Sequence, residues 1–110
     1  TADLKVLTAL LRRVCETPAP TFAEAARGRV VAGLLREYGL TPRTDPVGNV
    51  TAEVPGGEGP RVLVAAHLDT VFSAETDVRL RELPGRLAAP GVGDNSASLA
   101  VMLAYLRRRQ

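Results

Sequence analysis

One run of apolar residues constrains the fold of this chain more than any other feature. Residues 62–66 read Val-Leu-Val-Ala-Ala, with no polar residue among them. A strand with one face in water alternates apolar and polar side chains, whereas a strand covered on both faces has no need to alternate. The turn-forming residues 55–60 precede the run, and a polar segment that begins at His67 follows it. The run therefore predicts a buried strand in a sheet with helices on both faces.

Three other segments have the periodicity of helices. Their apolar stripes are Leu4-Leu7-Leu11-Val14, Phe22-Ala26-Val30-Leu34-Tyr38 and Leu99-Met102-Leu103-Leu106. Asp3 is the expected cap of the first helix, and the prolines of residues 17–20 end it. Thr21-x-x-Glu24 predicts a capping box for the second helix, and Gly39 predicts its end. The first two helices should form a helical hairpin.

Two further segments have the pattern of strands. Apolar and polar residues alternate through 49–54, which predicts a strand with one buried face. Residues 78–81 alternate again, with a turn at Pro84-Gly85, which predicts a short hairpin. The predicted fold class is α/β: a helical hairpin, then a mixed sheet, then a further helix.

Length and composition exclude several classes of protein. The chain has 110 residues, a net charge of +2 and one cysteine, so a disulfide framework and a Cys-rich zinc site are excluded. No apolar run approaches the roughly 18 residues of a membrane span. A nucleic-acid partner is not expected, because aromatic residues make up only 4% and Arg107–Arg109 read as solvated cations at a helix end. We expect a cytoplasmic protein, without nucleic-acid or membrane partners, whose ends at Thr1 and Gln110 are cut from a longer domain.

Candidate chemistry gathers at two places. His67, the only histidine, follows the predicted buried strand, and Asp69 lies two residues on, on the same side of an extended chain. Asp69 is placed to accept a hydrogen bond from the imidazole. Asp94 follows the turn at residues 91–93 and precedes the last helix. Each place also has a structural interpretation: His67 as a hydrogen-bonding residue at a strand end, and Asp94 as an Asx turn or helix cap.

The order of these motifs resembles a known family. His67-Leu-Asp-Thr-Val-Phe72, followed by Gly91-Val-Gly-Asp-Asn95, resembles the di-zinc amidohydrolases and exopeptidases. This group includes aminoacylase, peptidase T, acetylornithine deacetylase, succinyl-diaminopimelate desuccinylase and glutamate carboxypeptidases. Residues 17–22 and the helix that ends in Tyr38-Gly39-Leu40 are similar as well. The resemblance covers nearly the whole chain and implies that residues 1–110 are the N-terminal part of a three-layer α/β/α catalytic domain.

The resemblance also implies a role for each candidate residue. His67 would ligate one zinc, Asp69 would orient His67, and Asp94 would bridge two zinc ions, with cobalt or manganese as possible replacements. A zinc-activated water would hydrolyse an amide bond in a small peptide or N-acyl amino acid. The general base, the remaining ligands and an inserted domain that forms homodimers would lie downstream of residue 110. The resemblance also implies a cis peptide bond after Asp94 in the complete protein, whereas a fragment without the downstream ligands could relax to trans.

Two functions remain open from the sequence. The chain is either this part of a metal-dependent hydrolase, with little activity by itself, or a free-standing non-catalytic α/β domain that binds a partner. The first predicts that the Asp94 carboxylate lies beside the His67 imidazole. Donor atoms that share one zinc at roughly 2.0–2.2 Å are only about 3–4 Å apart.

Overall fold

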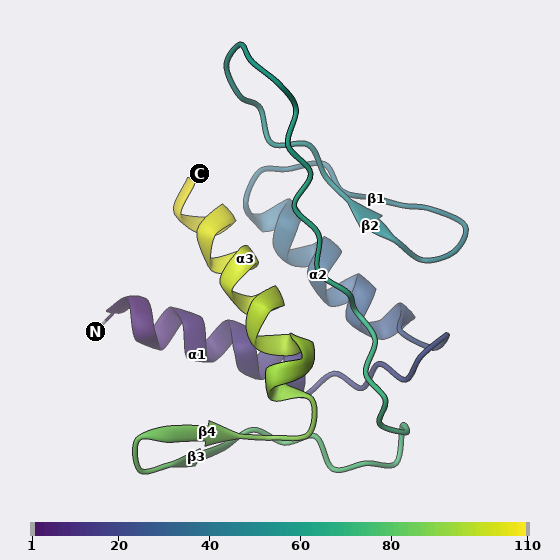
Figure 1. The fold of residues 1–110 in the computed structure, drawn as a ribbon, viewed down its shortest axis with the longest axis vertical. Helices are drawn as coiled ribbons and strands as arrows, with labels where there is room; N and C mark the ends of the chain where they lie inside the picture. Colours follow the sequence, from purple (N-terminus) through teal and green to yellow (C-terminus); the bar gives the residue numbers. More distant parts are fainter. Residues whose placement is uncertain (1, 110) are drawn as a thin grey trace.

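The computed structural model describes residues 2–109, which form three helices and two small hairpins (Figure 1). The elements are α1 (Ala2–Cys15), α2 (Ala25–Glu37), β1 (Arg43–Thr44), β2 (Val50–Thr51), β3 (Arg81–Leu83), β4 (Arg86–Ala88) and α3 (Ala97–Arg109). A kinked turn, η1 (Val92–Ser96), leads into α3. α3 packs across α1, α2 lies beside β2, and the β3–β4 hairpin lies against α1.

The predicted helices are all present, but their first turns differ from prediction. Asp3 lies inside the first turn of α1 rather than before it. The capping box at Thr21 and Glu24 is wrong: Glu24 is the N-cap of α2 and makes no side-chain cap hydrogen bond. The Thr21 hydroxyl instead donates to Oδ2 of Asp69 at 2.7 Å. The end of α2 agrees with prediction, since Gly39 adopts a left-handed φ of 82°.

The hydrophobic core lies between the three helices. Its fully buried members include Val14 of α1 with Leu99 and Leu103 of α3, all at most 1% exposed. The stripe predicted for α2 is confirmed in part: Leu34 and Tyr38 are buried and Val30 packs against the core, but Phe22 precedes the helix and is 97% exposed. The buried residues of α2 are Arg27, Gly28, Val31, Ala32, Leu34 and Leu35. A charged residue, Arg27, therefore lies on the face that packs inward.

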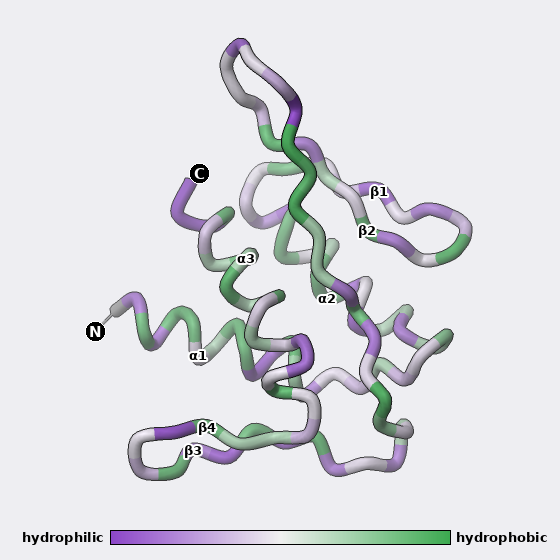
Figure 2. Tube along the Cα trace, in the orientation of Figure 1, coloured by the Kyte–Doolittle hydropathy of each residue, from purple (hydrophilic) through white to green (hydrophobic). Residues whose placement is uncertain are grey.

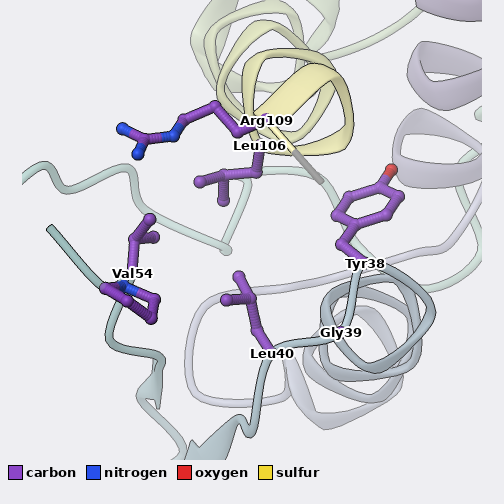
Figure 3. Close-up of a pocket in the computed structure, with 7 residues that line it drawn as sticks. Tyr38, Gly39, Leu40, Val54, Leu106 and Arg109 are labelled. Carbon is purple, nitrogen blue, oxygen red and sulfur yellow. The ribbon is translucent and has the colours of Figure 1, made fainter.

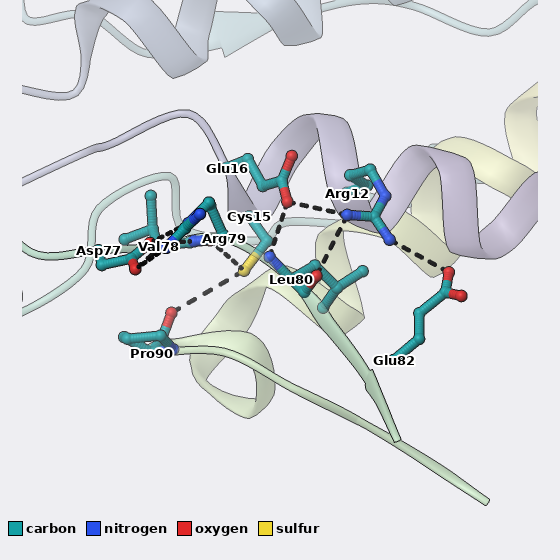
Figure 4. A network of polar contacts seen from close by, with 9 residues as sticks. All are labelled: Arg12, Cys15, Glu16, Asp77, Val78, Arg79, Leu80, Glu82 and Pro90. Atoms are coloured by element: carbon teal, nitrogen blue, oxygen red, sulfur yellow. Dashed lines mark hydrogen bonds and ion pairs between the residues drawn. The ribbon is translucent and has the colours of Figure 1, made fainter. Parts of the chain in front are cut away.

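The β3–β4 hairpin is confirmed, with its turn at Pro84-Gly85, and polar contacts fix it to α1 (Figure 4). Arg12 donates to the Leu80 carbonyl oxygen at 3.1 Å and to Oε1 of Glu82 at 3.1 Å. Glu16 accepts the Leu80 amide at 2.7 Å. These bonds hold in place the chain that leads through the hairpin to the turn before α3.

The buried strand predicted at residues 62–66 is wrong for this chain. The segment is extended, but among residues 2–109 no strand pairs with it (Figure 1). Val62, Leu63 and Val64 are 82%, 90% and 70% exposed, and the segment stands out as an apolar stretch of the chain trace (Figure 2). A strand forms only where a neighbour accepts its backbone hydrogen bonds, and no described strand is paired with this segment.

The prediction of a single mixed sheet is also wrong within the described residues. β1 pairs with β2 and β3 pairs with β4, each pair antiparallel and separate from the other. The predicted strand at 49–54 is shorter than expected, because only Val50 and Thr51 find partners. Parallel pairing is limited to one bridge between Pro20 and Thr70 in the described part of the chain. Helices and small antiparallel sheets are compatible with the α/β class. In residues 2–109, no helix is both long and apolar enough to cross a membrane.

Candidate metal centre

His67 lies at the end of the extended segment, where the chain becomes attached to the body of the molecule. The Thr70 amide donates to the Ala19 carbonyl oxygen at 2.7 Å, which fixes the segment three residues after His67. Nδ1 of the imidazole lies 3.0 Å from the backbone oxygen of Asp69 and 3.2 Å from its Oδ1. Both oxygens are acceptors, so Nδ1 carries the proton and donates. The predicted contact between Asp69 and His67 is present.

Asp94 reaches the same place from the turn before α3. Gly91 opens this turn with a left-handed φ of 76°. Oδ1 of Asp94 lies 3.1 Å from Nε2 of His67, although 27 residues separate them in the sequence. The predicted juxtaposition of carboxylate and imidazole is therefore confirmed. The peptide bond between Asp94 and Asn95 is cis, as the resemblance implied.

The donor atoms at this place suit a cation. With Nδ1 as the donor, Nε2 has a lone pair that can coordinate a metal ion, and a carboxylate oxygen such as Oδ1 of Asp94 is a second ligand atom. The two atoms are 3.1 Å apart. Two ligands of one zinc have a similar separation, about 3–4 Å. The side chains are 51% and 86% exposed, so a metal ion can reach them from solvent. The pair fits part of a zinc site.

Asp69 is held by a bond that the sequence did not reveal. The Thr21 hydroxyl donates to its Oδ2, and this bond is the main reason that the pKa of Asp69 lies below its ordinary value. The neighbouring His67 lowers the pKa further. Asp69 therefore stays ionised while one oxygen faces Thr21 and the other faces the imidazole.

Three other residues at this place were missed by sequence reasoning. Nδ2 of Asn95 donates to the His67 backbone oxygen at 3.0 Å. Arg27 donates to the Leu68 backbone oxygen at 3.0 Å. Thr21, assigned to a helix cap, holds Asp69. No local pattern links residues so far apart in the sequence, but the position of one of them, Arg27, is unusual. It lies four, seven and eight residues before members of the buried face of α2, where a charged residue is unexpected.

Two cavities lie away from His67 and Asp94. One of about 290 Å³ is formed where α2 and α3 end, beside the chain that follows β2 (Figure 3). Its lining residues are Tyr38, Gly39, Leu40, Val54, Pro55, Leu106 and Arg109. His67 and Asp94 are instead on an open surface. Among residues 2–109, no group of three or more His, Cys, Asp or Glu side chains could hold a metal ion.

This chain matches one protein family and several relatives of known sequence. The family model described as Peptidase family M28 matches residues 49–110, which include His67, Asp69 and Asp94. A protein of Pyrococcus abyssi is 41% identical over 61 residues, which are 56% of this chain and 18% of the relative. Proteins of Pyrococcus furiosus and Thermococcus kodakarensis are 39% and 36% identical over 61 residues, again 56% of this chain and 18% and 17% of theirs. All three are named as candidate LysW-lysine/LysW-ornithine hydrolases.

The matched region spans less than a fifth of these relatives, but it is more than half of this chain. The resemblance of the sequence to the peptidases and amidohydrolases is therefore confirmed. The chain belongs to Peptidase family M28.

Proposed function

We propose that this chain supplies His67 and Asp94 as metal ligands of a hydrolase that cleaves an amide bond. The observation that carries the proposal is the distance of 3.1 Å between Nε2 of His67 and Oδ1 of Asp94. The family match and the names of the relatives support hydrolysis as the reaction class. The substrate class is a small peptide or an N-acyl amino acid.

His67, Asp69 and Asp94 each have a defined role in this proposal. His67 presents Nε2 toward the ion, because Nδ1 is already bonded to Asp69. Asp69 is a positioning residue: it fixes the tautomer of the ring and raises its basicity. Asp94 adds the negative charge that two neighbouring dications need, and the native ions are zinc, with cobalt or manganese as substitutes. A bound zinc ion supplies a Lewis acid for the scissile carbonyl and lowers the pKa of water.

The rest of the catalytic apparatus belongs, in this proposal, to chain outside these residues. The relatives are more than five times as long as the matched segment, which leaves room for further ligands and a general base. The exposed apolar segment 62–66 would then become a central strand of a three-layer α/β/α domain. A homodimer formed through an inserted domain and a cytoplasmic location complete the proposal. The free thiol of the single cysteine, Cys15, fits a reducing compartment.

The metal role can be tested on this chain, because His67 is its only histidine. Zinc added to ¹⁵N-labelled protein should shift the ring nitrogen signals of His67, and Nε2 should shift most. Asp94→Ala should weaken this response, whereas Glu75→Ala, which removes another exposed carboxylate, should leave it unchanged. If zinc leaves the ring signals unmoved, the metal role is wrong, and the alternative of a non-catalytic binding domain is favoured.

The reaction can be tested in a chimera. Residues 49–110 of this chain would replace the matched segment of the Pyrococcus abyssi relative, with the intact relative as the positive control. The assay is zinc-dependent release of free amino acid from a panel of N-acetyl amino acids and dipeptides. His67→Ala should abolish the release. An active chimera that His67→Ala leaves unaffected would contradict the proposal.

A further inference from the structure

Arg27 of α2 is the charged side chain that the fold buries. It is 2% exposed, and within the part of the chain whose side chains are described, the other buried polar residues are Thr70 and Ser96. Burial is also the main reason that the pKa of its guanidinium lies below its ordinary value. A buried cation costs free energy unless it is fully hydrogen-bonded. Its position therefore calls for a specific set of acceptors.

Its acceptors come from three separate segments. Nε and Nη2 donate to the Thr17 backbone oxygen at 3.1 and 3.0 Å. Nη1 donates to the Leu68 backbone oxygen at 3.0 Å and to Oγ of Ser96 at 3.4 Å. No carboxylate forms an ion pair with Arg27 among residues 2–109. Its geometry therefore serves to join neutral backbone and hydroxyl groups.

Two of these acceptors are neighbours of the candidate metal ligands. Leu68 directly follows His67, and Ser96 lies two residues after Asp94. A single nitrogen, Nη1, thus bridges the segment that carries the imidazole and the segment that carries the carboxylate. The same segments are also joined by the bond from Asn95 to the His67 carbonyl and by the contact between His67 and Asp94, and both of these lie on the exposed side. The Arg27 bridge is the buried one, and water competes with it least.

We infer that Arg27 is a positioning residue that fixes the separation of His67 and Asp94 by bridging Leu68 and Ser96. The inference rests on the proposed metal role of the pair. A guanidinium suits this task because its planar fork of five donors can bond three segments at fixed angles. A lysine carries the same charge but concentrates its donors on one nitrogen.

The test compares zinc affinity in matched variants of this chain. Arg27→Met removes the donors but keeps a long apolar side chain, and Arg29→Met makes the same change at an exposed position two residues on. Zinc affinity is read from the His67 ring nitrogen signals, well below the thermal midpoint of each variant. Arg27→Met should weaken affinity about tenfold, as is typical when a group that orients a metal ligand is lost. Arg29→Met should change nothing.

Two further variants separate positioning from packing. Arg27→Lys should weaken zinc affinity as Arg27→Met does, since charge alone cannot bridge the segments. Ser96→Ala keeps Arg27 but removes its acceptor on the Asp94 side, and it should also weaken affinity, whereas the exposed Ser98→Ala should not. If Arg27→Met unfolds the chain, Ser96→Ala decides the question.

The outcomes distinguish the inference from the function on which it rests. If wild-type His67 signals do not respond to zinc, the proposed metal role fails. If they respond equally in wild type, Arg27→Met and Ser96→Ala, the metal role stands and the inference is overturned. A lower thermal midpoint with unchanged zinc affinity would show that Arg27 only stabilises the core. Full recovery in Arg27→Lys would overturn the claim that fork geometry matters.

Discussion

Three contacts hold His67, and two of them are with residues far away in the sequence. His67 contacts Asp69 through Nδ1, Asp94 through Nε2 and Asn95 through its backbone oxygen. The contacts of Nδ1 and Nε2 restrict the imidazole ring, and the bond from Asn95 holds the backbone that carries it. Such pre-organisation lowers the cost of binding, because less side-chain freedom is lost when the ligand arrives.

The glycine that opens the turn before Asp94 is the first residue whose replacement tests this arrangement. Gly91 has a φ of 76°, and a Cβ there would meet Cγ2 of Thr70 at 3.3 Å. Gly91→Ala should destabilise the chain by about 1–2 kcal/mol, the usual cost of a left-handed alanine, measured by urea unfolding. It should also weaken zinc binding at His67.

Gly93, two residues on, is the matched control for this change. A Cβ at Gly93 meets no atom within 4 Å, and the residue has no left-handed φ. Gly93→Ala should therefore cost less than Gly91→Ala. Equal losses in the two variants would show that the close approach to Thr70 has no consequence.

A second residue-scale prediction concerns acid stability. Hydrogen bonds from the Arg79 side chain and backbone lower the pKa of Asp77 from 3.8 to about 2. Because the folded-state pKa is depressed, Asp77 stabilises the fold above its ordinary pKa, and this contribution is lost as the pH falls from about 3.8 to about 2. Asp77→Asn should lower the thermal midpoint more at pH 5 than at pH 2. A difference of equal size at both pH values would contradict this account.

At the scale of elements, segments with similar apolar sequences differ in how far their side chains are buried. Leu103 of α3 is completely buried against the other helices, whereas Leu63 of the extended segment is 90% exposed. The difference follows from partners: a helix satisfies its own backbone and needs only one face covered, but a strand needs a neighbouring strand first.

This difference predicts opposite results for two leucine variants. Leu63→Asp should change the free energy of unfolding of this chain by no more than about 0.5 kcal/mol, as is usual at exposed positions. Leu103→Ala, the buried comparison, should cost about 2–5 kcal/mol. Urea unfolding measures both. A loss of several kcal/mol in Leu63→Asp would show that the segment packs against something in solution, for example a second copy of the chain.

At the scale of the whole molecule, the site is open, and among residues 2–109 no strand pairs with the extended apolar segment 62–66. Both features agree with the proposal that further chain completes the domain. The same proposal predicts that the 110-residue chain by itself binds zinc weakly and hydrolyses no N-acyl amino acid or dipeptide appreciably. A catalytic zinc normally has three protein ligands, and loss of a general base alone costs roughly 10²–10⁴ in rate.

A zinc-dependent release assay on the purified chain checks this last prediction. The intact Pyrococcus abyssi relative provides the comparison under the same conditions. Robust turnover by the short chain, abolished by a chelator, would show that His67 and Asp94 are not the whole of its metal site.

The sequence alone was sufficient for features that depend on neighbouring residues. Helix periodicity, the prolines after α1, Gly39 and the Pro84-Gly85 turn all act within a few residues, so the predicted helices and hairpin formed where expected. His67, Asp69 and Asp94 could be singled out by residue type and by resemblance, and the juxtaposition of His67 with Asp94 followed from the resemblance.

Only the tertiary structure decided the features that depend on residues far apart. Thr21 bonds to Asp69 instead of capping α2, and Arg27 joins Leu68 to Ser96, because folding brings these segments together. The prediction from the apolar run 62–66 was correct for the extended backbone but wrong for the burial of its side chains. The apolar composition of the segment indicates that burial would stabilise it. Burial in a sheet also requires neighbouring strands, and no strand among residues 2–109 pairs with this segment.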